Sequence, residues 1–333
     1  MKYVIIGAGA AGVAAAKAIK TIDRDGEVVV LGEERFFPYN RFLLTDFLCD
    51  SIPEDELVYT APGALKELGI TFRTGEYVKT INPEEKFVKL VHNEVQRYDK
   101  LLIATGGNPG LGPVLQPFSK HIQRYYSLED ILVLKRKLPE IKRCVVYGDG
   151  LSSLDLLRGL RNLGKEVSYI VRGERADLKL VDSELYGELH EFLESKGVEI
   201  FTEDRIISIE PEENRYRVKT LGRMELNADI VFAWDRYVSN IAVIKGTKIE
   251  KKLGILVNGR LRTSEPDIYA AGDCVEVYHP KLKNYWINFG WLNAQEQGTV
   301  AGKNMAGEET EYEIREVVMF NLMGKSLKAR WWK

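Results

Sequence analysis

The chain begins with a short apolar segment that runs directly into a glycine-rich turn. Residues 2–6 (KYVII) have the character of a buried strand, and residues 7–12 (GAGAAG) follow without a spacer. The alanine-rich residues 13–19 then predict a helix. In this order the first glycine permits a tight turn, the second admits a pyrophosphate, and the third lets helix and strand pack closely. We therefore predict a dinucleotide-binding loop formed by Gly7, Gly9, Ala10, Ala11 and Gly12.

A second predicted strand, residues 28–31, leads to the acidic pair Glu33 and Glu34. A carboxylate at this place can accept hydrogen bonds from the ribose hydroxyls of a bound dinucleotide. We expect Glu33 to have this role and Glu34 to be its solvated neighbour. A glycine-rich turn without a ligand is the alternative, and it is disfavoured because every part of the pattern is present.

The composition excludes several classes of protein. The 333 residues suffice for about two domains, and a net charge of −2 with scattered Lys and Arg indicates no nucleic-acid partner. No apolar run reaches the roughly 18–20 residues of a membrane span. Residues 14–16 (AAA) imitate a signal-peptide cleavage site, but the phosphate-loop glycines argue against that interpretation. The three cysteines, Cys49, Cys144 and Cys274, are far apart, which favours a reducing cytoplasm and no metal site.

A second unit of the same kind follows about 140 residues later. Residues 143–147 and 166–171 read as strands, and between them lie Gly148, Gly150 and a leucine-rich helix. Ser153 replaces the third glycine of the pattern. Residues 76–91 meanwhile predict a short β-meander with a turn at residues 82–85.

The second unit lacks the acidic residue that would bind a ribose. Val171 occupies that place, and the cations Arg172, Arg175 and Lys179 follow. A missing carboxylate with added cations is typical of sites that admit a 2′-phosphate, so the pattern favours NADPH over NADH. A solvated run of charges on a loop is an open alternative.

Over residues 1–324 the chain resembles the flavoprotein oxidoreductases with two dinucleotide domains, which include rubredoxin and ferredoxin reductases, NADH oxidases and the flavin module of nitrite reductase. Besides the glycine loops, four segments carry the resemblance: residues 37–44 (FPYNRFLL), 101–107 (LLIATGG), 263–274 (TSEPDIYAAGDC) and 293–298 (NAQEQG). The resemblance implies an α/β fold with two Rossmann-like domains of the glutathione-reductase type and a truncated C-terminal interface segment. It places FAD on residues 1–115 and 250–307, NAD(P)H on residues 116–249, and a short terminal segment at 308–333.

The resemblance also assigns roles to single residues. Asp155 would lie near the reacting rings, Asp273 would bind the ribityl chain, and amides around Gly298 would face the flavin. Arg41 would lie beside the ring or the diphosphate, with a surface ion pair as the open alternative. The remaining cofactor-binding positions would be Val78, Ala104, Thr105, Gly106, Gly148, Gly150, Arg172, Arg175, Gly272 and Gln297.

Several residues depart from the family's pattern. Asp155 stands where a longer Glu is usual, so its pairing with a cation is open, and Cys49 lies several residues beyond the usual redox cysteine. Trp234 and Asp235 put bulk and charge where a glycine usually admits nicotinamide. The last residues include Trp331 and Trp332, which we expect to cover the flavin region, dock on a partner subunit in an oligomer, or pack on the FAD domain.

Two functions follow from these patterns. The first is a cytoplasmic FAD-dependent oxidoreductase that takes hydride from NAD(P)H and passes electrons to a small redox protein such as rubredoxin or ferredoxin. The second is an FAD-binding electron-transfer subunit of a larger complex that no longer uses a nicotinamide. A flavin-stabilised scaffold without catalysis is disfavoured, because the flavin-facing motifs are intact.

Overall fold

The computed structural model describes residues 1–173, 186–315 and 317–330, which form two compact units. The first unit comprises Met1–Asn40, Val58–Asn108 and Val238–Arg315. The second comprises Arg41–Leu57, Pro109–Tyr237 and the described part of 316–333. Residues 41–57 thus belong to the second unit, whereas the sequence suggests the first. The cofactor expected for each domain stays a prediction.

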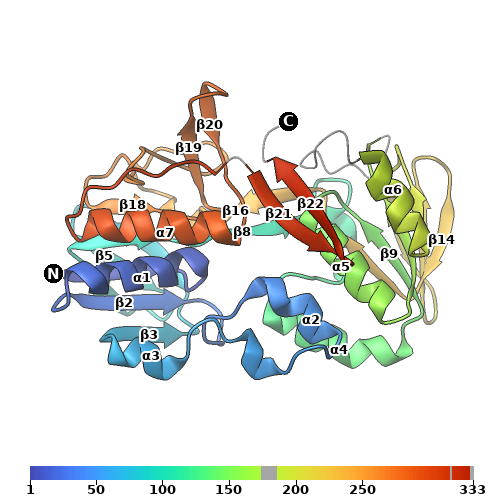
Figure 1. Cartoon of the computed structure of the whole chain (residues 1–333), viewed down its shortest axis with the longest axis horizontal. Coiled ribbons are helices and arrows are strands. Elements are labelled where there is room, and N and C mark those ends of the chain that lie inside the picture. The colour runs from blue at the N-terminus through green and yellow to red at the C-terminus, as the bar shows by residue number, and fades with distance from the viewer. Residues whose placement is uncertain (174–185, 316, 331–333) are drawn as a thin grey trace. The chain divides into compact units, whose positions relative to one another are not determined.

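The first unit is built on a parallel five-stranded sheet (Figure 1). Its elements are β1 (Lys2–Ile6), α1 (Ala10–Ile22), β2 (Glu27–Gly32), α3 (Pro62–Glu67), β3 (Ile70–Thr74), β4 (Val78–Asn82), β5 (Phe87–Leu90), β6 (Val95–Arg97), β7 (Lys100–Ile103), β17 (Ile255–Val257), β18 (Ile268–Ala270), β19 (Val275–His279), β20 (Asn284–Trp286) and α7 (Trp291–Met305). The strand order is β18-β7-β1-β2-β3, and β1 pairs in parallel with β2 and β7. This order brings the carboxyl ends of β1, β2 and β7 to one edge, where ligands bind in such sheets.

Helices α1 and α7 lie side by side, and small residues allow their close approach (Figure 1). A Cβ atom on Gly298 would lie 2.1 Å from the backbone oxygen of Ala11, and one on Gly302 would lie 2.5 Å from that of Ala15. Gly298 is the eighth residue of α7, beyond the first four N–H groups that a helix leaves unpaired. Gly298 therefore packs α7 against α1, and the expectation that amides around it face a flavin stays a prediction.

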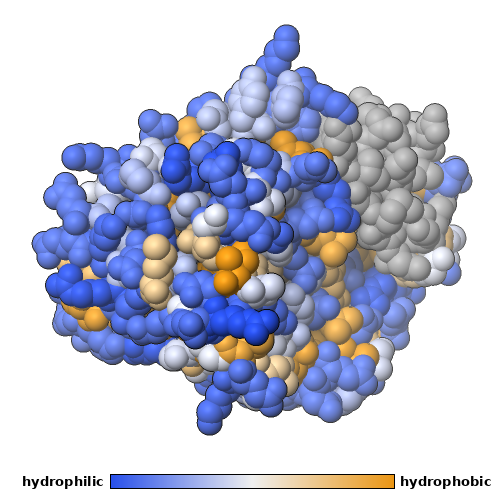
Figure 2. All heavy atoms as spheres, turned by 60° about the vertical axis from the view of Figure 1, so that its left-hand side comes forward, coloured by the Kyte–Doolittle hydropathy of each residue, from blue (hydrophilic) through white to orange (hydrophobic). Residues whose placement is uncertain are grey.

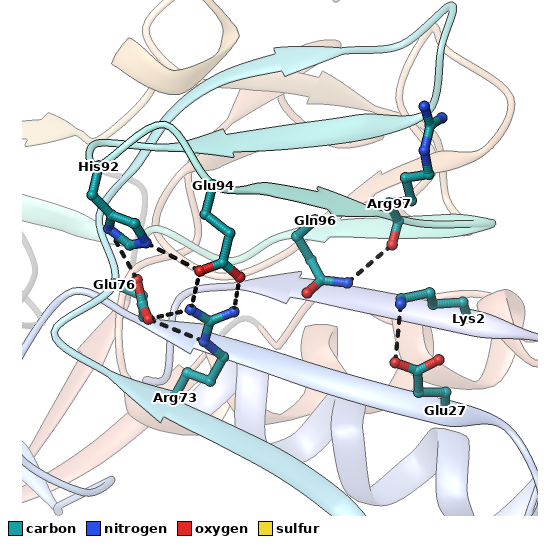
Figure 3. A network of polar contacts seen from close by, with 8 residues as sticks. All are labelled: Lys2, Glu27, Arg73, Glu76, His92, Glu94, Gln96 and Arg97. Carbon is teal, nitrogen blue, oxygen red and sulfur yellow. Dashed lines mark hydrogen bonds and ion pairs between the residues drawn. The ribbon is translucent and has the colours of Figure 1, made fainter.

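The predicted meander is confirmed, because β4, β5 and β6 form an antiparallel sheet. Arg73 at the end of β3 contacts Glu76 and Glu94, each at 2.5 Å, and His92 lies 3.2 Å from Glu94 (Figure 3). These contacts tie the turn between β5 and β6 to the parallel sheet. Glu94 and His92 are more than 40% exposed, so water screens the contacts of these two residues, and the role of the network is structural.

The second unit contains the predicted second strand–turn–helix–strand arrangement. Its elements are η1 (Arg41–Leu43), α2 (Leu44–Leu48), α4 (Leu128–Lys137), β9 (Arg143–Tyr147), α5 (Leu151–Asn162), β10 (Glu166–Ile170), α6 (Tyr186–Ser195), β11 (Val198–Phe201), β12 (Ile206–Pro211), β13 (Tyr216–Thr220), β14 (Glu225–Ala228), β15 (Ile230–Ala233), β21 (Val317–Leu322) and β22 (Lys325–Arg330). Strands β11, β10, β9 and β15 form a parallel sheet in that order, and β12, β13 and β14 form an antiparallel one. The chain passes between the units within β8 (Gly107–Gly110) and β16 (Arg236–Ser239). Strands β21 and β22 form an antiparallel hairpin.

The visible surface is mainly polar. On the face drawn in Figure 2, apolar side chains appear as separate patches among hydrophilic ones. Among the residues that the structure describes, no helix is both long and apolar enough to cross a bilayer.

Candidate functional site

The loop between β1 and α1 has the geometry that the glycine pattern predicts. A Cβ atom on Gly7 would lie 2.1 Å from the backbone oxygen of Ala104, and one on Gly12 would lie 2.0 Å from that of Gly7. Gly9 differs, because no atom lies within 4 Å of the Cβ position and its φ of −77° suits any residue. Open space, rather than backbone strain, thus accounts for a glycine here.

The N-terminus of α1 is suited to an anion. Gly9 is its N-cap and makes no side-chain capping bond, and the first turn, with Ala10 and Ala11, contains no acidic residue. The first N–H groups of such a helix need acceptors, and the helix dipole favours negative charge. Room at Gly9 and uncapped amides together fit a pyrophosphate.

Two acidic residues follow β2, as expected, and the structure distinguishes them. Glu33 is exposed, whereas the Oε2 atom of Glu34 accepts a 2.7 Å hydrogen bond from the hydroxyl of Tyr39. Glu33 therefore has the carboxylate that is better placed to receive ribose hydroxyls.

The A-T-G segment follows β7 and lies against the first glycine loop. The amide of Ala104 donates to the carbonyl of Ile6 at 2.7 Å. The hydroxyl of Thr105 donates to the carbonyl of Asn240 at 2.6 Å, and the side chain of Asn240 donates back to the carbonyl of Thr105 at 3.0 Å. Gly106 has a φ of +66° with open space at its Cβ position.

The segment around Asp273 lies between β18 and β19 and is hydrogen-bonded to α7 and to the N-cap of that helix. Gly272 has a φ of +86°, and its amide donates to the Oε1 atom of Gln297 at 2.7 Å. The Oδ1 atom of Asp273 accepts a 3.1 Å hydrogen bond from the amide of Gly290, the N-cap of α7. The carboxylate predicted to bind a ribityl chain is thus held at a helix N-terminus.

Several buried polar side chains near this segment have unsatisfied hydrogen-bond donors or acceptors. Asn288, Asn293 and Gln297 are at most 1% exposed. Both polar atoms of the Asn288 amide, the Oδ1 atom of Asn293 and the Nε2 atom of Gln297 have no hydrogen-bond partner among the described residues. Native proteins rarely leave such groups unsatisfied, so these atoms fit the contact surface of a polar ligand.

Val78 begins β4 and its side chain is 5% exposed within the core. Only its backbone can therefore reach a ligand. With the open Gly9, the uncapped α1, Glu33 and the buried amides, the first unit offers groups suited to the phosphate, ribose and polar ring edges of a dinucleotide.

The second glycine loop, between β9 and α5, resembles the first at its first glycine and differs from it at its end. A Cβ atom on Gly148 would lie 2.5 Å from the backbone oxygen of Trp234, whereas Gly150 is open and has a φ of +112°. Ser153 is fully buried, and its hydroxyl donates to the carbonyl of Gly148 at 2.7 Å. In the first loop Gly12 packs directly against Gly7, whereas in the second the hydroxyl of Ser153 connects α5 to Gly148.

Arg172 is engaged within the second loop. Its Nε and Nη2 atoms donate to the Oδ2 atom of Asp149 at 3.0 and 2.6 Å. Burial alone would lower the pKa of Arg172, but the contacts to Asp149 outweigh it and raise that pKa. Arg175 and Lys179, which completed the predicted phosphate site, lie outside the described residues.

Trp234 and Asp235 both have partners within the second unit. Trp234 is 7% exposed, and its ring lies against Gly148. The Oδ1 atom of Asp235 accepts a 2.6 Å hydrogen bond from the amide of Gly112. Trp234 therefore packs on the second glycine loop, and Asp235 holds the segment around Gly112.

Asp155 lies in α5 at the centre of a polar network. Its Oδ1 atom accepts from Arg158 at 2.8 and 3.0 Å, and its Oδ2 atom accepts from the hydroxyl of Thr45 and lies 3.3 Å from that of Tyr125. Arg158 also donates to Asp46 at 2.5 Å. The cation that pairs with Asp155 thus comes from its own helix, one turn later, which answers the question that the sequence left open.

Burial and charge shape this network. Burial raises the pKa of Tyr125, and the neighbouring Asp155 raises it further, so the phenol stays protonated. Burial would lower the pKa of Arg158, but its bonds to Asp46 and Asp155 raise it. The network therefore holds the Asp155 carboxylate in one orientation.

Arg41 lies in η1 and belongs to the second unit. Its guanidinium lies 4.5 Å from the centroid of the Tyr126 ring and donates to the carbonyl of Tyr126 at 2.8 Å. The position that we expected beside a flavin or diphosphate stays a prediction.

Cys49 follows α2 directly. Its Sγ atom lies 3.5 Å from the carbonyl of Gly159, and burial raises its pKa to about 11. A reactive thiol needs a lowered pKa, so this environment disfavours a redox role.

Sequence reasoning missed Thr45, Tyr125, Arg158 and Asn240. Thr45 is 0% exposed, and a fully buried hydroxyl in an apolar segment could have indicated a polar partner. For the other three residues, no local sequence pattern indicates the hydrogen-bond partner.

Comparisons with known proteins agree with this geometry. The family model described as pyridine nucleotide-disulphide oxidoreductase matches residues 1–298. The chain is 30% identical over 276 residues to the assimilatory nitrate reductase electron transfer subunit of Bacillus subtilis, with 83% of this chain but only 36% of that protein covered. It is 28% identical over 312 residues to the NADH-rubredoxin oxidoreductase of Clostridium acetobutylicum, with 93% and 76% covered.

A solved structure shows the same fold. The NAD-dependent persulfide reductase of A. fulgidus superposes with a TM-score of 0.92 at 27% identity, covering 99% of this chain and 64% of that one. The chain thus spans about a third of the nitrate reductase subunit and about two thirds of the persulfide reductase chain.

Proposed function

The chain belongs to the pyridine nucleotide-disulphide oxidoreductase family, and on this premise we propose that it is an FAD-dependent oxidoreductase that takes hydride from NAD(P)H and passes electrons to a small redox protein. The observation that supports this proposal most is that the same strand–loop–helix arrangement occurs in both units. Each unit has a strand, a glycine loop and a helix, and the second glycine of each loop, Gly9 or Gly150, opens onto free space.

FAD belongs to the first unit in this proposal. Its pyrophosphate binds at Gly9 and the N-terminus of α1, its ribose at Glu33, and its ribityl chain at Asp273, while buried amides such as Gln297 receive the polar groups of the ring. Ala104, Thr105, Gly106, Gly272 and the backbone of Val78 line the same site. When bound, FAD supplies a ring that accepts a hydride and releases electrons.

The nicotinamide nucleotide belongs to the second unit, at Gly148 and Gly150. Arg41 and Asp155 are the side chains that we propose near the reacting rings. Because hydride transfer needs alignment more than proton exchange, the contribution of Asp155 is a fixed negative charge held by Thr45, Tyr125 and Arg158.

The acceptor that we propose is a small iron protein, in line with the relative named as an NADH-rubredoxin oxidoreductase. Three cysteines without disulfide partners suit a reducing cytoplasm. An oligomer formed through Trp331 and Trp332 is a further proposal, and these residues lie outside the described part of the chain.

A second candidate is an FAD-binding subunit of a larger complex that does not use a nicotinamide. Two observations favour this candidate. One is the relative named as a nitrate reductase electron transfer subunit, and the other is the carboxylate of Asp149 in the second loop.

Anaerobic titration of the purified flavoprotein with NADH and NADPH distinguishes the two candidates. Loss of the absorbance near about 450 nm with either nucleotide supports the first candidate. Loss with dithionite alone supports the second, and a protein that takes up no flavin contradicts both.

A further inference from the structure

The second glycine loop contains a carboxylate that the first loop lacks. Asp149 lies between Gly148 and Gly150, where the first loop has Ala8. Its Oδ2 atom accepts two hydrogen bonds from Arg172, and its Oδ1 atom is buried without a partner among the described residues. The side chains of Asp149 and Arg172 are 26% and 41% exposed, so the pair is partly shielded from water.

A negative charge at this place opposes the binding of any dinucleotide. A pyrophosphate held at Gly150 is adjacent to Asp149 in the loop, and two negative groups at short range repel each other. Helix α5 provides no compensating side chain, because Gly150 caps it and its first turn is uncharged. The forked contact from Arg172 is therefore the feature that neutralises the loop.

The backbone on both sides of Arg172 is fixed. The carbonyl of Val171 accepts from the amide of Asp204 at 3.1 Å, and that of Gly173 accepts from Glu203 at 2.8 Å. Moving the guanidinium toward another anion thus means breaking its contacts to Asp149 through side-chain rotation, which leaves the carboxylate uncompensated.

We propose that Arg172 neutralises Asp149 in the loop instead of receiving a 2′-phosphate, and that the second site consequently prefers NAD(H) to NADP(H). This inference rests on the proposed function and reverses the preference that the sequence suggests. The physical reason is that the added phosphate of NADP(H) competes with Asp149 for the same guanidinium.

Calorimetric titration of the oxidised flavoprotein with NAD⁺ and NADP⁺ tests the inference without turnover. The unaltered chain binds NAD⁺ more tightly. Arg172→Gln exposes the charge of Asp149 and weakens NAD⁺ binding by up to about fivefold, the range expected for a partly exposed pair. Asp149→Asn with Arg172→Gln restores NAD⁺ binding, and Asp149→Asn alone raises the affinity for NADP⁺ relative to NAD⁺.

A matched control uses another pair in the same unit. Arg215 contacts Glu212 at 2.6 Å, and its side chain is 50% exposed, so Arg215→Gln should change neither affinity. Flavin content and circular dichroism verify that each variant is folded.

The inference is overturned if Arg172→Gln weakens NADP⁺ binding and leaves NAD⁺ binding unchanged, or if the unaltered chain prefers NADP⁺. If neither nucleotide binds and neither bleaches the flavin, the result contradicts both the proposed function and the inference. If NAD⁺ binds to the unaltered chain and to Arg172→Gln with the same affinity, the result contradicts only the inference.

Discussion

At the scale of single residues, charged side chains in the second unit are held by specific partners. Arg158 connects two carboxylates, Asp155 and Asp46, and is 18% exposed at its side chain. Removing such a residue leaves its partners with unpaired charge, and this loss exceeds the value of the bonds themselves.

Arg158→Gln is expected to lower the free energy of unfolding by about 1.5–3 kcal/mol, the range for hydrogen bonds to charged groups. Urea denaturation measures this loss. Arg143 forms a more exposed pair with Glu166, with 56% and 74% of the side chains accessible, so Arg143→Gln should cost less than about 1 kcal/mol. Equal losses for the two variants would contradict a special role for Arg158.

Cys49 gives a prediction for the dependence on pH. Burial raises its pKa from 9.0 to about 11, so the neutral thiol is favoured in the folded chain. The resulting stabilisation is complete below pH 9 and is lost as the pH rises through about 11. At pH 8 alkylation of Cys49, followed by peptide mass spectrometry, should be much slower in the native chain than in urea. Equal rates would indicate an accessible thiolate.

At the scale of elements, the sequence allowed both strand–loop–helix units and the meander to be predicted, because their signals are local. The pattern over residues 2–19 contains strand, turn and helix within one window, and β9 matches its predicted bounds. Long-range pairs could not be predicted. Thr45 and Asp155 are 110 residues apart, and only the folded chain brings them together.

The packing of α1 on α7 depends on glycines. Gly302→Ala would place a Cβ atom 2.5 Å from the backbone oxygen of Ala15, so we expect a loss of about 1–3 kcal/mol in the free energy of unfolding. Gly63→Ala in α3 is the matched control, since no atom lies within 4 Å of its Cβ position and alanine favours a helix. Thermal unfolding of both variants measures the difference. A stable Gly302→Ala variant would contradict the close packing.

At the scale of the whole molecule, the two units have similar glycine loops that differ in the charged residues around them. The first unit has an uncapped helix with no acidic residue in its first turn and an exposed carboxylate after β2. The second has a carboxylate inside the loop itself, neutralised by Arg172. These differences predict that FAD stays bound to the first unit and that the nicotinamide nucleotide exchanges at the second.

The FAD content of the purified chain and of its Gly9→Val variant tests this account most directly. Because nothing lies within 4 Å of the Cβ position of Gly9 and its φ is −77°, valine should leave the fold intact but occupy the space for the pyrophosphate. We predict a single FAD per chain in the unaltered protein and none in the Gly9→Val variant. The circular dichroism of the variant should be unchanged, because its fold stays intact. A folded Gly9→Val variant that retains FAD, or an unaltered chain that takes up no FAD when it is added in excess, would contradict the account.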